Sequence, residues 1–594
     1  MCGIAGYVGP RNAAATVLDC LSRLDYRGYD SCGITVLDGD SLFYRRRVGR
    51  IDKLRDETLN LAPLGHVAIG HTRWATHGGV DTRNAHPLMS CDGAISVVHN
   101  GTIENYDLLR SRLREQGHFF SSDTDSEVIP HLLEQGVREG KTFDQSFYEL
   151  PRALHGSYAV LAVHRGCERI YAVRKDAALV VGIGSNELFP SSDIPSFLPL
   201  TPKTVYVDEG DCLVLDGNGI RTLERVDGEL TLIPDNHPIT TLSADEISIS
   251  KDGFDHFMIK EILEQMHTIE RECQLDLAGL QEAVKLLDGA EGIWLLGAGT
   301  SYHAGLFGEY LFQKFSKHRA WACVSSEFEF RDEFVTSHSA AIALSQSGET
   351  ADTILAARAA RERGARLIAI TNVPQSRLAA MADVVIPLHS GREIAVAATK
   401  SYTSELAVLI LLAHCFKADV SAGQRMLLLA RDSILNITSD ASRRHLLGIA
   451  NELVGAKSIF LLGRGPHRIT ALEAGLKMKE VSRIHSEAFP SGEMKHGPLA
   501  LIEEGTPVVL FYDQSSQPQS EIAGSEFHSR GARVYSVGPK PLQVSANHIK
   551  VADAGLATPI AHIVPMQILA YEVARIRNVD PDYPRNLAKS VTVV

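Results

Sequence analysis

The chain has 594 residues, several times the usual size of one domain, and therefore predicts two to four domains. A formal net charge of −13 at pH 7, without a long Lys or Arg run, argues against nucleic acid or an anionic membrane surface as a partner. The longest apolar run, Leu406 to Phe416, is too short to span a membrane and is typical of a buried helix. The N-terminus lacks the features of a secretion signal and the nine cysteines form no CxxC pair, so we expect a cytoplasmic protein with reduced thiols.

The first part of the chain, residues 2–217, contains short apolar runs such as Tyr158 to Val163, separated by turn residues. This pattern indicates stacked antiparallel sheets with covering helices. From Ile293 onward, short apolar runs alternate with helical stretches, which indicates parallel sheets with crossover helices. We interpret residues 218–283 as a polar linker that includes the start of a helix at Asp255.

The second half of the chain contains an internal duplication. Three pairs of matching segments occur in the same order: Leu296–Gly299 with Leu462–Gly465, Ser326–Phe328 with Ser486–Phe489, and Gly364–Arg366 with Gly531–Arg533. Their offsets are 166, 160 and 167 residues (463 − 297, 487 − 327 and 531 − 364). This spacing predicts two similar α/β subdomains, residues 284–423 and 450–584, with a ligand at their junction and a C-terminal tail, 585–594.

Cys2 becomes the N-terminal residue if Met1 is removed, which places a thiol and an α-amine on one residue. The amine has a pKa of about 7.7 to 8.0 and can act as the base for the thiol in acyl transfer. Position alone favours the alternative, a small buried residue.

Acyl transfer from an amide also needs donors for an oxyanion and partners for the charges of an amino acid. The Asn100 side chain and the Gly101 N–H, after the strand Ala94 to Val98, are candidates for the oxyanion hole. Arg73 is a candidate for pairing with an α-carboxylate, and Asp125 for an α-ammonium group. Taken singly, an Asn-Gly turn, a surface Arg and a helix-capping Asp are the alternatives.

Spacing argues against two other kinds of site. His71, His77 and His86 lack the i, i+4 pattern of helical zinc ligands, so we expect no metal ion. The two glycine turns lack the third glycine of a dinucleotide site, where the chain has Tyr302 and Arg468. We therefore expect no cofactor.

A phosphate site is predicted where the strand Ala341 to Leu344 runs into Ser345 to Thr350 and a helix begins at Ala351. Hydroxyls and backbone N–H groups at a helix N-terminus bind anions, although a Ser/Thr helix cap is the commoner role. Proton transfer between C1 and C2 of a ketose phosphate also needs a base. Glu473, Lys477 and Glu480 share one helix face and are candidates, with a solvated charge stripe as the alternative.

The first part of the chain resembles class II glutamine amidotransferases. The matching strings are Cys2-Gly3-Ile4, Tyr26 to Ser31, Thr72 to Gly78, His99-Asn100-Gly101 and Thr124-Asp125. The resemblance implies an αββα hydrolase fold with an N-terminal nucleophile, Cys2, and an oxyanion hole of Asn100 and Gly101. The implied glutamine-binding residues are Arg73, Trp74, Thr76 and Asp125, and the resemblance also implies that Trp74 gates an ammonia channel that the C-terminal tail closes.

The two repeats resemble the tandem sugar-isomerase (SIS) domains of the glutamine–fructose-6-phosphate aminotransferase (isomerizing) family, and the similarity covers essentially the whole chain. The matching strings are Ser345 to Thr350, Glu473 to Glu480, Ser491 to Pro498 and Pro584 to Val593. The resemblance implies two doubly wound parallel-sheet subdomains. It also implies transfer of glutamine nitrogen to fructose 6-phosphate and isomerisation to glucosamine 6-phosphate, the first step of hexosamine and UDP-N-acetylglucosamine synthesis.

The same resemblance implies residue roles. Lys589 forms a Schiff base with C2, and Glu480 moves a proton between C1 and C2 with assistance from Lys477. His496 opens the sugar ring from the neighbouring subunit, so a homodimer is implied. The implied sugar-phosphate-binding residues are Thr300, Ser301, Ser345, Gln346, Ser347, Thr350, Val396 and Ala588.

Two positions depart from the family pattern: Ala298, where bacterial members often have Cys, and Ala398, where Ser is usual. The resemblance implies that the missing hydroxyl at 398 costs one substrate hydrogen bond, worth about 0.5–1.5 kcal/mol, with the backbone at this position as an alternative donor or acceptor.

Two other functions stay open at this stage. One is a regulator that senses a sugar phosphate without reacting, which the reactive residues Lys589, Glu480 and His496 disfavour. The other is an enzyme that aminates a different sugar phosphate or releases ammonia from an amino sugar. The intact glutaminase half disfavours the deaminase.

Overall fold

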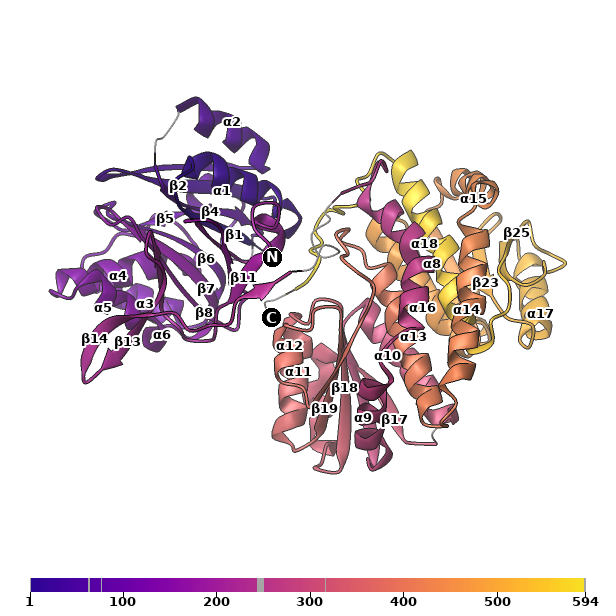
Figure 1. The fold of residues 1–594 in the computed structure, drawn as a ribbon. Coiled ribbons are helices and arrows are strands. Elements are labelled where there is room, and N and C mark those ends of the chain that lie inside the picture. Colours follow the sequence, from indigo (N-terminus) through magenta and orange to yellow (C-terminus); the bar gives the residue numbers. More distant parts are fainter. Residues whose placement is uncertain (1, 62–64, 76, 243–249, 316, 592–594) are drawn as a thin grey trace. The chain divides into compact units, whose positions relative to one another are not determined.

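The structure, a computed structural model, describes residues 2–61, 65–75, 77–242, 250–315 and 317–591. The chain forms two compact units, the first extending to residue 249 and the second running from Ser250 to Ser590 (Figure 1). Within the described residues, none of the helices combines the length and the apolar composition that a membrane span requires.

Two antiparallel sheets form the centre of the first unit. The eight-stranded sheet has the order β15-β11-β9-β10-β1-β4-β2-β3 and consists of β1 (Gly3–Val8), β2 (Ser31–Asp38), β3 (Ser41–Val48), β4 (Val67–Arg73), β9 (Val180–Ile183), β10 (Leu188–Ser191), β11 (Lys203–Tyr206) and β15 (Thr240–Thr241). The seven-stranded sheet has the order β14-β13-β12-β8-β7-β6-β5 and consists of β5 (Leu88–Met89), β6 (Ile95–Ile103), β7 (Gly156–His164), β8 (Ile170–Lys175), β12 (Leu213–Asp216), β13 (Gly219–Val226) and β14 (Glu229–Pro234).

Helices cover the outer faces of both sheets. They are α1 (Ala13–Ser22), α2 (Ile51–Leu61), α3 (Tyr106–Glu115), α4 (Val128–Arg138), α5 (Phe143–Tyr148) and α6 (Leu150–Ala153). The helix α1 contacts β1 and β4, and α4 contacts β6. Successive residues of β7 point to opposite faces: Val160 joins a core with the helices, whereas Leu161 joins the core between the sheets. The predicted αββα layers are confirmed.

Residues 218–283, which we expected to be a linker, are divided between the two units. The strands β13 and β14 continue the seven-stranded sheet beyond β12. Their residues are mostly half-buried or exposed, so a polar composition hides two strands. The helix α8 (Phe257–Glu272) begins close to the predicted start at Asp255 and packs against α13 and α14 of the second unit.

Two parallel five-stranded sheets form the second unit, and their strand orders are equivalent. The order β17-β16-β18-β19-β20 is built from β16 (Gly292–Gly297), β17 (Ala320–Val324), β18 (Ser339–Ser345), β19 (Arg366–Thr371) and β20 (Val384–Pro387). The order β22-β21-β23-β24-β25 is built from β21 (Ser458–Gly463), β22 (His485–Pro490), β23 (Pro507–Phe511), β24 (Arg533–Gly538) and β25 (Asn547–Lys550). The predicted duplication and the parallel sheets are confirmed.

The strand register corrects one of the three matched segments. Ala320 pairs with Ile293, and Ser486 pairs with Ile459 on the equivalent strands, so Ala320 and Ser486 are equivalent at an offset of 486 − 320 = 166 residues. The match of Ser326 with Ser486 was therefore wrong. Ser326 lies in a 3-10 turn after β17, whereas Ser486 lies inside β22.

The remaining helices of the second unit are α9 (Leu277–Asp288), α10 (Thr300–Phe315), α11 (Ala351–Glu362), α12 (Arg377–Ala380), α13 (Lys400–Cys415), α14 (Val420–Ile437), α15 (Asp440–Leu453), α16 (Pro466–Lys477), α17 (Gln517–His528) and α18 (Thr558–Ile576). Nearly all residues of α13 and α18 are buried, which confirms the predicted buried helix at Leu406 to Phe416. One hydrophobic core contains residues of both repeats, and α10 contacts α16 across their junction.

Candidate active sites

Cys2 lies directly before β1, in the middle of the eight-stranded sheet. Because Gly3 pairs with Thr72 on β4, the chain following β4 lies beside Cys2. Trp74 N donates to Cys2 Sγ at 3.2 Å, and Trp74 O lies 3.5 Å from the same sulfur. Burial raises the pKa of the Cys2 thiol, while the Trp74 N–H and the charge of Arg73 lower it by less. A thiol of raised pKa is protonated at neutral pH and needs a base to become a nucleophile.

Asn100 is held beside Cys2 by His71, a residue without a predicted role in catalysis. Asn100 Nδ2 donates to Cys2 O at 3.0 Å, and Asn100 Oδ1 lies 3.1 Å from His71 Nε2. Burial lowers the pKa of His71 to about 3, so its ring is neutral. The His99 carbonyl is 3.0 Å from the same Nε2, which therefore carries the hydrogen and donates to both oxygens. This contact fixes which end of the Asn100 amide faces Cys2.

Gly101 follows Asn100 on β6 and has a backbone φ of +120°. A Cβ at this position would lie 2.0 Å from the Ser157 carbonyl oxygen on β7, so no larger residue fits. The structure thus brings Asn100, on β6 of the seven-stranded sheet, to Cys2, directly before β1 of the eight-stranded sheet, and Gly101 follows Asn100, as an oxyanion site requires.

Two buried charges of opposite sign lie close to this site. Arg73 donates to the carbonyls of Gly78 at 3.0 Å and Gly79 at 3.2 Å. Asp125 accepts from Ile103 N at 2.7 Å, and its charge acts on Arg73. A guanidinium and a carboxylate are the partners that a zwitterionic amino acid needs.

Of the other two predicted glutamine-binding residues, the structure describes only Trp74. Trp74 packs edge-to-face on Tyr29, with ring centroids 5.7 Å apart. Thr76 lies outside the described residues.

The predicted phosphate loop connects β18 to α11. Ser345 Oγ accepts from Gly348 N at 3.0 Å and lies 3.3 Å from Thr350 Oγ1, so the loop folds over its own hydroxyls. Gly348 has a φ of +65°. The Gln346 carbonyl accepts from Asn372 N at 3.1 Å, which ties the loop to the end of β19.

The C-terminal tail reaches this loop. Ser590 Oγ lies 2.9 Å from Ser347 Oγ, and the preceding residue, Lys589, forms an ion pair of 2.5 Å with Glu393. The Glu393 side chain is fully buried. Burial alone would raise the pKa of Glu393, but the Lys589 charge and hydrogen bonds, including one from Ser401 Oγ at 2.7 Å, lower it to about 2.

Glu393 was missed by the sequence reasoning. The only feature of the sequence that could have indicated Glu393 is its position directly before the apolar stretch Ile394 to Ala398.

The three residues predicted to share a helix face lie at the junction of the two repeats. Lys477 Nζ is 2.6 Å from Glu480, 3.4 Å from Glu473 and 3.3 Å from Thr300 Oγ1 of the first repeat. Glu473 and Lys477 are fully buried, which excludes a solvated charge stripe. Burial lowers the pKa of Lys477, but the two carboxylates raise it above its ordinary value. Glu480 lies in a short π-helix, Met478–Ser482, a form that is frequent at functional sites.

Two of the remaining predicted site residues of the second unit, Ser301 and Val396, have partners outside this cluster. Ser301 Oγ donates to Glu405 at 2.8 Å, and burial raises the pKa of Glu405 to about 8. Val396 N donates to the Asp582 carbonyl at 2.9 Å, and Ala588 is half-buried. His496 is exposed, and within the described part of the chain its ring pairs with none of the other predicted site residues.

Comparisons with known proteins agree with this division. The SIS domain family matches residues 286–415 and 452–574, and the glutamine amidotransferase domain family matches residues 71–198. The C-terminal domain of glucosamine-fructose-6-phosphate aminotransferase from Francisella tularensis is 29% identical with a TM-score of 0.52, covering 56% of this chain and 100% of that structure.

Full-length relatives carry one name, glutamine–fructose-6-phosphate aminotransferase (isomerizing). The protein from Thermococcus kodakarensis is 39% identical and that from Pyrococcus horikoshii is 40% identical, each over 100% of both chains. The protein from Thermus thermophilus is 39% identical, again over 100% of both chains. This chain therefore belongs to the glutamine–fructose-6-phosphate aminotransferase (isomerizing) family.

Proposed function

We propose that this protein transfers the amide nitrogen of glutamine to fructose 6-phosphate and isomerises the product to glucosamine 6-phosphate, releasing glutamate. The observation that carries the proposal is the contact of 2.9 Å between Ser590 and Ser347. It brings Lys589 to a loop suited to a phosphate, as a reaction at the carbonyl of a sugar phosphate requires. The full-length relatives, each named for this reaction, support the same conclusion.

In the first unit, Cys2 Sγ attacks the amide carbon of glutamine and forms a thioester, releasing ammonia. Water then hydrolyses the thioester to glutamate. The α-amine of Cys2, once Met1 is removed, takes the thiol proton, and Asn100 with the Gly101 N–H stabilises the oxyanion. Arg73 and Asp125 hold the carboxylate and the ammonium group of glutamine, and Trp74 and Thr76 complete its binding.

In the second unit, the hydroxyls of Ser345, Ser347 and Thr350 and the Gln346 amide bind the phosphate, while Thr300, Ser301, Val396 and Ala588 hold the sugar. Lys589 condenses with C2 and releases water, and ammonia then replaces the lysine to give the C2 imine. Glu480 takes a proton from C1 and returns it to C2, and the proton of the O1 hydroxyl moves to the nitrogen, which leaves an aldehyde at C1 and an amine at C2. Lys477, held between two carboxylates, assists this transfer.

Lys589 must lose a proton before it can form an imine. Glu393 is the hydrogen-bonding partner of its ammonium group, so we assign to Glu393 the positioning of this amine. Substrate binding then has to separate the ion pair, because the amine attacks the carbonyl only when it is neutral.

Three further features belong to the proposal. The protein acts as a cytoplasmic homodimer, and His496 of one subunit opens the sugar ring bound by the other. The exposure of His496 and the absence of a partner for its ring among the described site residues support this assignment.

The test uses glutamine labelled with ¹⁵N in its amide. The purified chain should convert fructose 6-phosphate into ¹⁵N-glucosamine 6-phosphate and form one glutamate for each amino sugar. Cys2→Ala should abolish glutamine hydrolysis and still bind fructose 6-phosphate. Unlabelled product, or ammonia release from glucosamine 6-phosphate as the main activity, would refute the proposal.

A further inference from the structure

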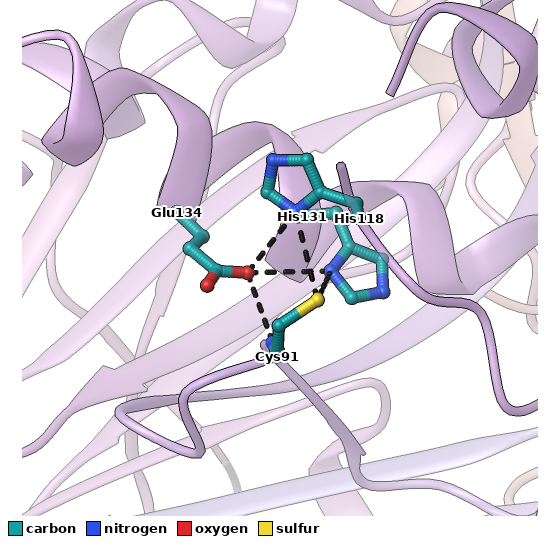
Figure 2. A group of neighbouring side chains, drawn as sticks. All are labelled: Cys91, His118, His131 and Glu134. Atoms are coloured by element: carbon teal, nitrogen blue, oxygen red, sulfur yellow. Dashed lines mark hydrogen bonds and ion pairs between the residues drawn. The ribbon is translucent and has the colours of Figure 1, made fainter. Parts of the chain in front are cut away.

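Four potential metal ligands meet in the first unit, away from the residues proposed for catalysis. They are Cys91, in the turn between β5 and β6, His118, after α3, and His131 and Glu134 on α4. Their ligand atoms all lie within 4.8 Å of one another. Figure 2 shows both imidazole rings and the carboxylate turned toward the Cys91 sulfur.

Four of the six distances between the ligand atoms fit a tetrahedron around one ion, and the other two are at most 4.8 Å. Cys91 Sγ lies 3.7 Å from His118 Nδ1 and 3.6 Å from His131 Nδ1. Glu134 Oε2 lies 3.2 Å from His118 Nδ1 and 3.4 Å from His131 Nδ1. Zinc bond lengths of about 2.3 Å to sulfur and about 2.0–2.1 Å to nitrogen or oxygen place tetrahedral ligands about 3.6 Å and about 3.3 Å apart, respectively.

Hydrogen bonds on the far side of His118 show which of its nitrogens faces the cluster as an acceptor. Gln135 Nε2 donates to Glu139, so Gln135 Oε1, 3.0 Å from His118 Nε2, accepts the hydrogen of that nitrogen. The other ring nitrogen, His118 Nδ1, therefore faces the cluster and lies 3.2 Å from Glu134 Oε2, a separation that suits two ligands of one ion.

The surroundings also match those of a metal centre. His118, His131 and Glu134 are at most 3% exposed. His131 Nε2 faces the Glu127 carboxylate at 3.8 Å, a common arrangement for the second nitrogen of a metal-bound histidine. One thiolate and one carboxylate balance the charge of a divalent ion, and the Arg138 guanidinium, 2.5 Å from Glu134 Oε1, balances the Glu127 carboxylate beside the site.

We propose that Cys91, His118, His131 and Glu134 bind one zinc ion in a structural site. Four protein ligands complete the tetrahedron and leave no position for substrate, which distinguishes this centre from a catalytic one. The ion joins the turn before β6, the segment after α3 and the helix α4. Glu127, which also accepts from Ser121 N at 2.8 Å, lies two residues from Asp125, so the ion stiffens the segment that carries the proposed ammonium anchor.

The experiment measures metal binding directly, so its result does not depend on the proposed activity. The full chain is stripped with a chelator, loaded with Co²⁺ as a spectroscopic probe and then with Zn²⁺, and its metal content is determined. We expect one ion per chain, a thiolate-to-cobalt charge-transfer band and intense tetrahedral d–d bands.

Matched variants identify the ligands. Cys91→Ser should abolish the charge-transfer band, and both Cys91→Ser and His118→Gln should raise the Kd for Zn²⁺ by about 100-fold or more. Cys167→Ser and His164→Gln, which change a cysteine and a histidine elsewhere in the same unit, should leave both readouts unchanged.

X-ray absorption of the zinc-loaded wild-type chain needs no variant and therefore tests the proposal even if a substitution prevents folding. It should show one sulfur at about 2.3 Å and three nitrogen or oxygen atoms at about 2.0–2.1 Å. A chain that binds no stoichiometric ion, a shell without sulfur, or unchanged binding in Cys91→Ser would overturn the proposal.

Discussion

His71 illustrates how a buried residue that does not react can decide the geometry of a reacting one. Its Nε2–H donates to Asn100 Oδ1, and this bond turns the Asn100 amide hydrogens toward Cys2. Its ring also stacks on His86 with centroids 4.3 Å apart, which restricts the ring orientation. The oxyanion donor is therefore positioned by His71 on β4 and by His86 in the segment before β5.

We predict that His71→Leu lowers kcat for glutamine hydrolysis by about 10- to 100-fold, since losing an oxyanion-hole donor outright costs about 10²- to 10³-fold. His71→Gln keeps a donor and should lose less. Steady-state glutamate release from both variants, with circular dichroism to verify folding, tests this. Equal losses in the two variants would show that His71 only fills space.

Lys589 combines an ion pair with a reactive amine, and a substitution can separate these two properties. Lys589→Arg keeps a positive charge for Glu393 but cannot form an imine. We predict that this variant hydrolyses glutamine and makes no glucosamine 6-phosphate. Borohydride with fructose 6-phosphate should attach the sugar to Lys589 in the wild-type chain, as detected by peptide mass. Comparable amino-sugar formation by the Arg variant would mean that Lys589 only anchors the tail.

The loop between β18 and α11 depends on one backbone conformation. Gly348 has a φ of +65°, and a Cβ there would lie 1.9 Å from Ser376 Oγ. The loop therefore tolerates no side chain at the point where its hydroxyls turn toward the helix N-terminus.

We predict that Gly348→Ala raises KM for fructose 6-phosphate by about 10-fold, because strain of about 1–2 kcal/mol displaces the hydroxyls. Gly448→Ala is the matched control. Gly448 lies inside α15 with nothing within 4 Å of the added Cβ, so the substitution should leave KM unchanged and stabilise the helix by up to about 1 kcal/mol. Unchanged KM in Gly348→Ala would remove this loop from phosphate binding.

The second unit buries several carboxyl groups, and their partners do not fully offset the free-energy cost of burying the ionised form. Burial raises the pKa values of Glu261, Glu272 and Glu405 to about 8 from the ordinary 4.5. A carboxyl group whose pKa is raised by folding makes its full contribution to the stability of the native state at pH values below its pKa in the unfolded chain. That contribution is lost as pH rises from about 4.5 through 8, because the unfolded chain ionises first.

Glu405→Gln removes one such group and keeps an acceptor for Ser301 Oγ. We predict that the variant loses less stability than the wild type between pH 5 and pH 8, by on the order of 1–4 kcal/mol. Calorimetric unfolding at a series of pH values measures this, with exposed Glu282→Gln as a control. Parallel pH profiles for the wild type and Glu405→Gln would show that Glu405 ionises normally in the folded chain.

Patterns in the sequence alone were enough to predict many of the structural elements of this protein. Apolar runs predicted the sheets and the buried helix at Leu406 to Phe416, because these depend on neighbours along the chain. Matching segments at a near-constant offset predicted the repeat. The strand-to-helix loop at Ser345 to Thr350 was equally local. The resemblance decided in favour of Cys2 as the nucleophile, over a small buried residue, and added the tail lysine.

The partners of these residues were decided only by tertiary structure. Glu393 forms an ion pair with Lys589, which is 196 residues away in the sequence, and His71 forms a hydrogen bond with Asn100, which is 29 residues away. Cys91 and His131 are 40 residues apart, so the i, i+4 spacing rule that argued against a metal could not detect their cluster. Strand pairing and packing set such contacts and the burial of each charge, and neither follows from the residues adjacent in sequence.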